Sequence, residues 1–427
     1  MKKSIITCDL EGTILTMNDV AEEIFGYKKE ELINKKRVSI FSPGEIVLQN
    51  VESWLSTAVK NGEYLGETIF INKKQEQINA KIKITPTFQN GKDGKHIGYC
   101  GITEKIDKKI HVKIKPTTKI IKWLAITRMP FTTASLLPVI CVSTYLSSTG
   151  INVFDTTSLT LCILGIILAH LGSNLFNDYF DNIDGTDEGN NDYFQQLSGG
   201  SRAIELGLIN LKGTRNLGVI FILIALCLLI AILMFANKNN INGILITSII
   251  GLFLGFFYTA PPIRLVSRNG LGELAIFLAF GPLLTLGTGF AIFNGNLVES
   301  NYFIDCILIG IPLGLLTTNI LMINQFPDMK SDIKTGKNHL VATFGKNKSI
   351  YIYIAIYILS IISSIILGYE LNNRYIYIST LFILISSIYL SNYLGKFYNS
   401  RKLIKANWLT IHTHTIFSII LIITFLI

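Results

Sequence analysis

The stretch SNLFNDYFDNIDGTD, residues 173–187, begins inside an apolar segment and turns into a run of carboxylates and carboxamides. At 3.6 residues per helical turn, these polar side chains fall on two adjacent stripes of one helix. A carboxylate at membrane depth costs about 2.5 to 3.5 kcal/mol on insertion scales, so a cluster is kept only where it faces water, a cation or a partner charge. The stretch therefore predicts a helix end that presents oxygen ligands, carried by Asn174, Asn177, Asp178, Asp181 and Asp184.

A second polar stretch, NQFPDMKSD at residues 324–332, repeats this pattern about 147 positions downstream. Asn324, Asp328 and Asp332 follow one another at intervals of four residues, which keeps them near one face of a helix. Two apolar segments that end in similar clusters predict an internal repeat whose clusters face each other. Several oxygen ligands, with room left for water and phosphate oxygens, are typical of magnesium. The two clusters therefore indicate Mg2+-dependent chemistry on a diphosphate.

The composition is that of a membrane protein with an additional polar segment. Of 427 residues, 49% are hydrophobic and 16% are charged, and the mean hydropathy is +0.45. The net charge of +9 does not indicate nucleic-acid binding, because Lys and Arg lie at the ends of apolar segments, where membrane orientation signals belong. The six cysteines occur singly, without a CxxC pair, so neither a zinc site nor a disulfide framework is expected.

Nine apolar segments are long enough to span a bilayer as helices. They lie near residues 123–146, 157–176, 216–236, 241–260, 272–293, 302–325, 350–368, 375–394 and 408–427. With the amino terminus inside, the inner connections hold fourteen Lys and Arg, and the outer connections hold two. This positive-inside bias predicts a multi-pass protein of the cell membrane, with its amino terminus and both acidic clusters on the cytoplasmic side.

Residues 1–107 have the character of a small soluble α+β domain. Alternating apolar and polar residues predict a strand pair, short helices and a three-stranded antiparallel remainder. The box IFGY at 24–27 and the closing GYCGIT at 98–103 resemble the PAS sensor family. The resemblance implies a regulatory module whose partner is a small-molecule ligand or a dimer contact. Neither flavin nor haem is favoured, because the Asn-Cys-Arg helix motif and a central-helix histidine are both missing from the sequence.

A basic connector, residues 108–122, follows this domain and precedes the first apolar segment. We expect it to be a juxtamembrane linker attracted to anionic headgroups.

Three further stretches in the predicted cytoplasmic loops carry basic residues. They are SGGSRAIELGL at 198–208, YTAPPIRLVSRNGLGE at 258–273, and the continuation of the second cluster through residue 337. Arginine forks, lysine ammonium groups and backbone amides of glycine turns complement the oxygens of a diphosphate. We therefore expect the diphosphate to be bound by Arg202, Arg264, Lys334 and Lys337.

From about residue 118 to its end, the chain resembles the UbiA family of intramembrane prenyltransferases. The family's Asn-Asp-x-x-Asp signature corresponds to residues 177–181, and its Asp-x-x-x-Asp signature corresponds to residues 328–332. The residues NDY at 177–179, YTAPP at 258–262 and GK at 336–337 are most similar to the 1,4-dihydroxy-2-naphthoate prenyltransferases of menaquinone synthesis. The resemblance implies a nine-helix membrane bundle over residues 123–427.

The resemblance also implies an activity: Mg2+-dependent transfer of a polyprenyl group from a polyprenyl diphosphate to an aromatic acceptor, 1,4-dihydroxy-2-naphthoate above all. Metal binding is implied for Asp178, Asp181, Asp187, Asp328 and Asp332, of which all but Asp187 are also expected to be catalytic. Substrate binding is expected of Asn174, Asn177, Asn324 and, at the family's usual Arg-Pro position, Arg128.

Two residues of this implied site carry alternatives. Many family members have an aspartate where this chain has Gly185, so either Asp184 or Asp187 must complete the first cluster, and we favour Asp187. Tyr258 is expected to shield the allylic cation through its ring face, but an interfacial tyrosine of the aromatic belt fits equally well.

Two other functions are compatible with the sequence. The acceptor could be another quinone ring, a tetrapyrrole or a glycerol phosphate ether lipid. A PAS-linked membrane receptor or transporter is an alternative of another class, which would place acidic residues in the middle of the spans rather than at their ends.

Overall fold

The computed structural model describes residues 2–91, 94–149, 155–190, 193–194 and 197–427. The chain forms two compact units. The first consists of Met1–Ile126 together with Ser201–Asn210, and the second of Thr127–Gly200 and Leu211–Ile427.

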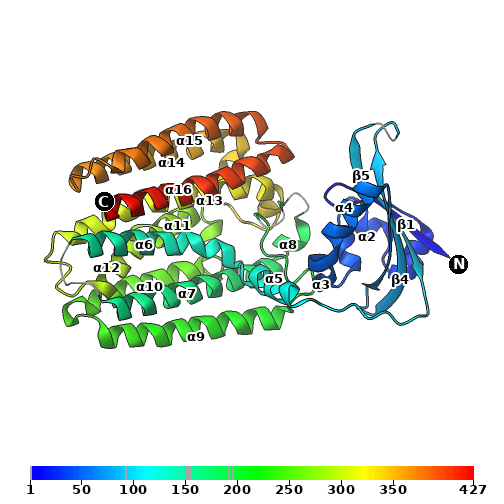
Figure 1. The fold of residues 1–427 in the computed structure, drawn as a ribbon, viewed down its shortest axis with the longest axis horizontal. Coiled ribbons are helices and arrows are strands. Elements are labelled where there is room, and N and C mark those ends of the chain that lie inside the picture. The colour runs from blue at the N-terminus through cyan, green and yellow to red at the C-terminus, as the bar shows by residue number, and fades with distance from the viewer. Residues whose placement is uncertain (1, 92–93, 150–154, 191–192, 195–196) are drawn as a thin grey trace. The chain divides into compact units, whose positions relative to one another are not determined.

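The first unit contains a five-stranded antiparallel sheet in the order β2-β1-β5-β4-β3 (Figure 1). Its strands are β1 (Lys3–Asp9), β2 (Ile14–Met17), β3 (Tyr64–Ile71), β4 (Gln77–Phe88) and β5 (His96–Lys105). Its short helices are α1 (Asp19–Phe25), α2 (Lys29–Leu32), α3 (Gly44–Ile46) and α4 (Glu52–Asn61), with a 3-10 turn at Val38–Phe41 and a π turn at Val47–Val51. This arrangement confirms the predicted small α+β domain.

Local sequence explains the limits of α1. The Asn18 side chain caps its first turn by accepting from Ala21 N–H at 3.0 Å. The helix ends at Gly26, whose left-handed backbone (φ 75°) is freely open only to a residue without Cβ. The helix buries Phe25 against Phe41, with ring centroids 4.2 Å apart.

The basic connector begins as a strap on this domain. After β5, Lys108 pairs with Glu67 at 2.8 Å, and Ile110 N–H donates to Asn79 Oδ1 at 3.1 Å. Further along, Gln49 makes two hydrogen bonds with the connector's backbone. The chain then enters α5 (Pro116–Thr127).

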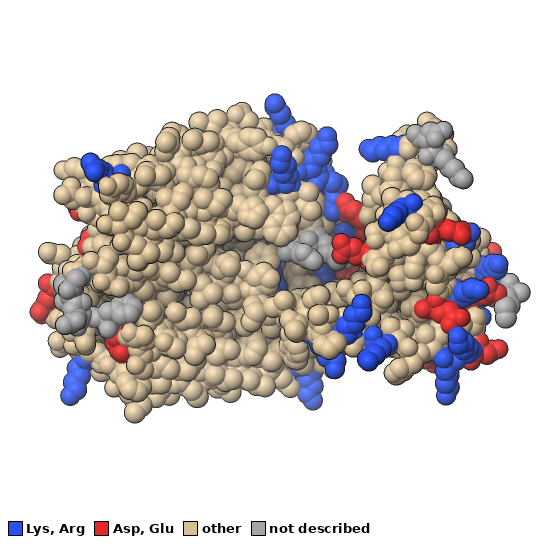
Figure 2. Space-filling view, in the orientation of Figure 1, with Lys and Arg blue, Asp and Glu red and all other residues tan. Residues whose placement is uncertain are grey.

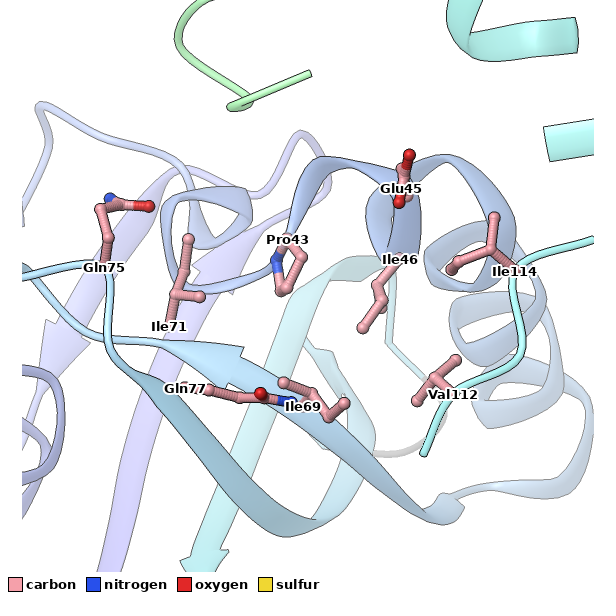
Figure 3. A pocket seen from close by; sticks show the side chains of 9 residues that line it. All are labelled: Pro43, Glu45, Ile46, Ile69, Ile71, Gln75, Gln77, Val112 and Ile114. Atoms are coloured by element: carbon pink, nitrogen blue, oxygen red, sulfur yellow. The ribbon is translucent and has the colours of Figure 1, made fainter. Parts of the chain in front are cut away.

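A cavity of about 350 Å3 lies beside this strap (Figure 3). The edge strand β3, the hairpin that follows it, helix α3 and the strap all contribute side chains to its wall. They are Pro43, Glu45, Ile46, Ile69, Ile71, Gln75, Gln77, Val112 and Ile114.

The second unit is a bundle of helices (Figure 1). The described residues contain nine segments that are long and apolar enough to cross a membrane, the number that the sequence predicts. The helices are α6 (Thr133–Ser148), α7 (Thr156–Ile183), α8 (Thr186–Gly189), α9 (Leu211–Phe235), α10 (Ile241–Phe257), α11 (Leu271–Phe280), α12 (Pro282–Ile292), α13 (Tyr302–Lys334), α14 (Leu340–Glu370), α15 (Ile376–Phe397) and α16 (Ile404–Leu426). On the side of this unit that Figure 2 shows, the described residues between its two ends are uncharged.

Two spans differ from their predicted form. The first was expected from residue 123, but Arg128 adopts a left-handed conformation (φ 52°), which separates α5 from the span that begins at Met129. The fifth is broken into α11 and α12 at Gly281. A Cβ there would lie 2.6 Å from the Gly310 carbonyl oxygen, so close packing against α13 requires glycine at this break.

The two helices that carry the acidic clusters are among the three longest of the bundle, together with α14. At 1.5 Å per residue, α7 with 28 residues is about 42 Å long, and α13 with 33 residues is about 50 Å long. The hydrocarbon core of a bilayer is about 30 Å thick. Both helices therefore have length to spare, and their acidic last turns need not lie among lipid tails.

Candidate active site

The carboxyl-terminal ends of α7 and α13 meet around Lys337. Its Nζ lies 2.6 Å from Asp181 Oδ1 on α7, and the two side chains are only 8% and 7% exposed. The segments that follow the helices are also joined, because Thr186 Oγ1 donates to Thr335 Oγ1 at 3.0 Å. The structure thus brings the two clusters together, as the repeated spacing predicts.

Lys337 is surrounded by negative charge. Its burial acts to lower the pKa of the ammonium group, but the carboxylates of Asp181, Asp332 and Asp187 outweigh this effect and raise the pKa above its usual value. Asp181 and Asp187 belong to the first cluster, and Asp332 belongs to the second. Lys337 is therefore a permanent positive charge between the two clusters.

Asp328 is held by neutral donors from the segment that precedes Ser201. Its Oδ1 accepts from Asn190 Nδ2 at 2.7 Å and from Ser198 Oγ at 3.0 Å. Its Oδ2 accepts from the Gly199 backbone N–H at 2.8 Å. These bonds fix the orientation of the carboxylate without neutralising its charge.

Asp332 is held from the start of α14. His339 Nε2 lies 3.0 Å from Asp332 Oδ2, and the histidine is 1% exposed. The backbone carbonyl of Asp332 accepts from Lys337 N–H at 2.8 Å, which folds the turn after α13 back onto its last residues.

Gly200 lies against two carboxylates of the first cluster. A Cβ at this position would be 3.0 Å from Asp178 Oδ1 and 3.3 Å from Asp187 Oδ1. Gly200 also has a left-handed backbone (φ 73°). Because Gly200 has no side chain, the carboxylates of Asp178 and Asp187 can both approach its Cα.

Asp184 and Asp187 lie in different environments. Asp184 is partly exposed and pairs with Arg264 at 2.7 Å, while Arg264 also donates to the Thr335 carbonyl at 3.2 Å. Asp187 is 8% exposed and faces the cluster. The left-handed Gly185 (φ 73°) ends α7 between them and turns the chain. Asp187 is thus the residue that joins Asp178.

Tyr258 follows the last residue of α10. Burial, and then the negative charges of Glu273, Asp181 and Asp332, raise the pKa of its phenol well above the usual value, while Arg128 acts in the opposite direction. The phenol is therefore neutral and lies within electrostatic reach of both clusters.

The predicted asparagines make different contacts. Asn174 Nδ2 donates to the Thr127 carbonyl at 3.2 Å, and Asn324 Oδ1 accepts from Asn407 at 2.8 Å. Asn177 Oδ1 is buried and has no hydrogen-bond partner among the described residues. Asn177 thus has a buried oxygen that is available to a ligand.

Three predicted basic residues lie in different surroundings. Arg128 stacks on the Phe131 ring at 4.9 Å. Arg202 pairs with Glu205 at 3.0 Å inside the segment that belongs to the first unit. Lys334 is exposed at the end of α13.

Sequence reasoning missed several residues that hold the carboxylates. Ser198 and Gly199 lie in the glycine-rich stretch 198–208, in which only Arg202 was predicted to bind the diphosphate. Their role as donors to Asp328 has no sequence signature. His339 precedes an apolar helix, where a capping residue is expected, yet histidine is not a usual cap. Asn190 carries no signal, because asparagine is common in loops.

The donor set fits a magnesium–diphosphate complex. Over the described ranges, no three Asp, Glu, His or Cys side chains come close enough to form a complete metal site by themselves. Magnesium is usually bound by one or two carboxylates, with water and substrate phosphate oxygens completing the shell. The convergence of Asp178 and Asp187 on Gly200, and the buried Asn177 Oδ1, are suited to that incomplete kind of site.

Comparisons with known proteins agree with this geometry. The model of the UbiA prenyltransferase family matches residues 135–414, and a PAS domain model matches residues 2–103. UbiA prenyltransferase domain-containing protein 1 of Dictyostelium discoideum is 27% identical over 250 residues, which are 58% of this chain and 71% of that protein. The 1,4-dihydroxy-2-naphthoate octaprenyltransferase of Haemophilus influenzae is 29% identical over 200 residues, 46% of this chain and 60% of that enzyme.

A solved structure shares the fold. The UbiA homolog from Archaeoglobus fulgidus bound to GPP and Mg2+ superposes with a TM-score of 0.52 at 17% identity, over 71% of this chain and 98% of that one. The family match covers well over half of the sequence and lies on the nine-span bundle. The chain is therefore a multi-pass membrane protein that belongs to the UbiA prenyltransferase family and carries an amino-terminal PAS domain.

Proposed function

We propose that this chain transfers a polyprenyl group from a polyprenyl diphosphate to 1,4-dihydroxy-2-naphthoate, with Mg2+ as cofactor, in menaquinone biosynthesis. The observation that carries the proposal is the meeting of two carboxylate clusters around the buried Lys337. The acceptor is suggested by the naphthoate enzyme of Haemophilus influenzae and by the residues that resemble its class. The donor and the metal are suggested by the GPP and Mg2+ in the Archaeoglobus fulgidus homolog.

In this proposal, the carboxylates hold the metal ions. The ligands are Asp178, Asp181, Asp187, Asp328 and Asp332, with Asn177 Oδ1 facing the donor. Bound Mg2+ supplies positive charge that stabilises the departing diphosphate. Lys337 adds a fixed positive charge between the clusters, and Arg264 adds one at the rim beside Asp184.

The reaction breaks the bond between the allylic carbon and the diphosphate oxygen. The bonding electrons leave with the diphosphate, and the electron-rich acceptor ring attacks the allylic cation, then loses a proton to restore aromaticity. Tyr258 is suited to face the cation because its phenol stays neutral, and a neutral ring face attracts positive charge. The isoprenoid tail would lie among the apolar side chains of the bundle.

The clusters and the PAS domain are proposed to lie on the cytoplasmic side. The support is the excess of Lys and Arg in one set of loops. Water-soluble phosphorylated and aromatic metabolites are found on that side.

The decisive experiment incubates membranes containing the full chain with Mg2+, a labelled polyprenyl diphosphate and a panel of acceptors. We expect prenylated 1,4-dihydroxy-2-naphthoate as product, and loss of turnover by at least about 10³-fold in Asp328→Asn, because metal and diphosphate binding both fail. Lys348→Met, at an exposed position of α14 outside the proposed site, is the matched control and should retain activity. Product on a different acceptor would replace the naphthoate assignment. Product on no acceptor, with labelled donor moved across the membrane, would favour a transporter.

We further propose that the PAS domain regulates the enzyme. The support is a contact inside the first unit, where Gly44 of α3 touches the segment Ser201–Asn210. A Cβ at position 44 would lie 2.3 Å from the Leu206 carbonyl oxygen and 2.7 Å from the Leu208 side chain. That segment continues directly from Gly199 and Gly200, which contact the carboxylates.

The cavity of Figure 3 adds a place for a small ligand, because Pro43 and Glu45, the residues on both sides of Gly44, line its wall. The proposed organisation is a sensor at 1–107, a linker at 108–122 and a catalytic domain at 123–427. Gly44→Ala is expected to change the rate several-fold. Gly101→Ala in β5 is the control, because a Cβ there meets only ordinary contact at 3.8 Å from Ile6 O. Equal rates in both variants would argue against the regulatory route.

A further inference from the structure

His339 makes two polar contacts in the candidate site, one with the start of α14 and one with Asp332. It is the N-cap residue of α14, and its Nδ1 accepts from Ala342 N–H at 3.1 Å. On the other side of the ring, Nε2 lies 3.0 Å from Asp332 Oδ2. One buried imidazole therefore contacts both a helix start and a carboxylate of the second cluster.

These two contacts determine where the ring carries its proton. Nδ1 accepts a backbone N–H, so it cannot itself be protonated. The proton of the neutral ring must then be on Nε2, which donates it to Asp332. His339 is thus a neutral donor to Asp332 rather than a second positive charge like Lys337.

The backbone is held on both sides of His339, at Asn338 and at Leu340. Asn269 N–H donates to the Asn338 carbonyl at 2.9 Å. Leu340 N–H donates to Glu273 Oε1 at 2.8 Å, and the same oxygen accepts from Gln325 at 2.9 Å.

Glu273 thereby ties α11, α13 and the start of α14 to one atom. It is 3% exposed. Through Glu273, the backbone next to the imidazole is connected to α13, where Asp332 lies.

We propose that His339 is a positioning residue that orients the Asp332 carboxylate for metal binding, on a platform built by Glu273. The inference rests on the proposed function, because Asp332 is assigned there as a metal ligand. It goes beyond that function by assigning to His339 a role separable from capping. A neutral donor suits this role, since it holds one carboxylate oxygen and leaves the negative charge available to a cation.

Two substitutions separate the two contacts. In His339→Asn, the amide can replace Nδ1 as the cap but cannot reach Asp332. In His339→Gln, the amide N–H can replace Nε2 as the donor but leaves Ala342 N–H uncapped. His414→Asn is the control, because His414 is an equally buried histidine of α16, outside the second cluster and the start of α14.

The test titrates Mn2+, in place of Mg2+, into the purified full chain with inorganic pyrophosphate present, followed by electron paramagnetic resonance. Melting temperature is measured in parallel. We expect His339→Asn to raise the Mn2+ dissociation constant by about 10- to 100-fold with little change in melting temperature, as is typical of lost partners of metal ligands. His339→Gln should bind Mn2+ nearly as the natural chain does but melt at a lower temperature.

The outcomes separate the two levels of the proposal. Natural Mn2+ affinity in His339→Asn, while Asp332→Asn binds weakly, would show that His339 is only a cap and would overturn the inference. Natural affinity in Asp332→Asn would remove the metal assignment itself, and the proposed function would fail at that point.

Discussion

The two carboxylate clusters are stabilised by different chemistry. Asp181 of the first cluster is paired with the buried ammonium of Lys337. Asp328 of the second accepts from neutral donors among the residues that the structure describes, which are Asn190, Ser198 and Gly199.

Asp332, also of the second cluster, likewise receives a neutral imidazole donor from His339. A charged partner cancels the charge of a carboxylate, whereas neutral donors orient it and leave the charge in place. The difference suggests that the second cluster is ready to bind a cation, and that the first exchanges its contact with Lys337 when cation and diphosphate arrive.

The largest effect should come from breaking the charged pair. Lys337→Met would leave Asp181 buried without its partner and should destabilise the chain by about 3 to 5 kcal/mol. The double variant Asp181→Asn/Lys337→Met should recover most of that loss, because no uncompensated charge remains. Denaturant unfolding in detergent measures both, with the exposed Lys334→Met as control. A single variant as stable as the natural chain would mean that the pair is not a buried ion pair.

The next effect should come from filling the space between Asp178 and Asp187. Gly200→Ala forces a side chain into a left-handed backbone, which costs about 1 to 2 kcal/mol, and puts a methyl group 3.0 Å from Asp178 Oδ1. Gly207→Ala has a similar backbone (φ 65°) but meets nothing within 4 Å, so it isolates the strain. We expect the prenylation rate of Gly200→Ala to be at least tenfold lower than that of Gly207→Ala. Equal loss in both variants would show that only strain matters.

Removing one neutral donor should have a smaller effect. Ser198→Ala deletes one of the three groups that orient Asp328, at a cost of about 1 kcal/mol, because two donors remain. We expect a loss of activity below tenfold, measured as the Mg2+ concentration for half-maximal rate. A loss as large as that of Asp328→Asn would mean that the donors act as a single unit.

The smallest effect is expected from the partly exposed ion pair between Asp184 and Arg264. Asp184→Asn breaks a partly exposed ion pair with Arg264, worth at most about 1 kcal/mol, and should leave activity within about threefold. Asp187→Asn, by contrast, should reduce activity strongly, since it removes a buried carboxylate of the cluster. The reverse order of the two rates would assign the metal to Asp184.

Much of the site follows from spacing along the chain. Intervals of three and four residues put Asp178 and Asp181 on one helix end, and Asp328 and Asp332 on another, as the structure has them. Lys337 was predicted to bind diphosphate, and the structure adds its contact with Asp181. The break at Gly281 could not be predicted, because it depends on the closeness of Gly310, which lies 29 residues further along the chain in α13.

The sequence by itself determined the nine apolar spans, the α+β domain before them, and the two repeated sets of oxygen-bearing residues, because hydrophobic length and helical period are local properties. Only the tertiary structure decided which neighbour holds each carboxylate: Lys337 for Asp181, the segment around Ser198 for Asp328, and His339 for Asp332. These partners come from loops and helix starts, whose positions are set by packing between distant segments rather than by any periodic pattern.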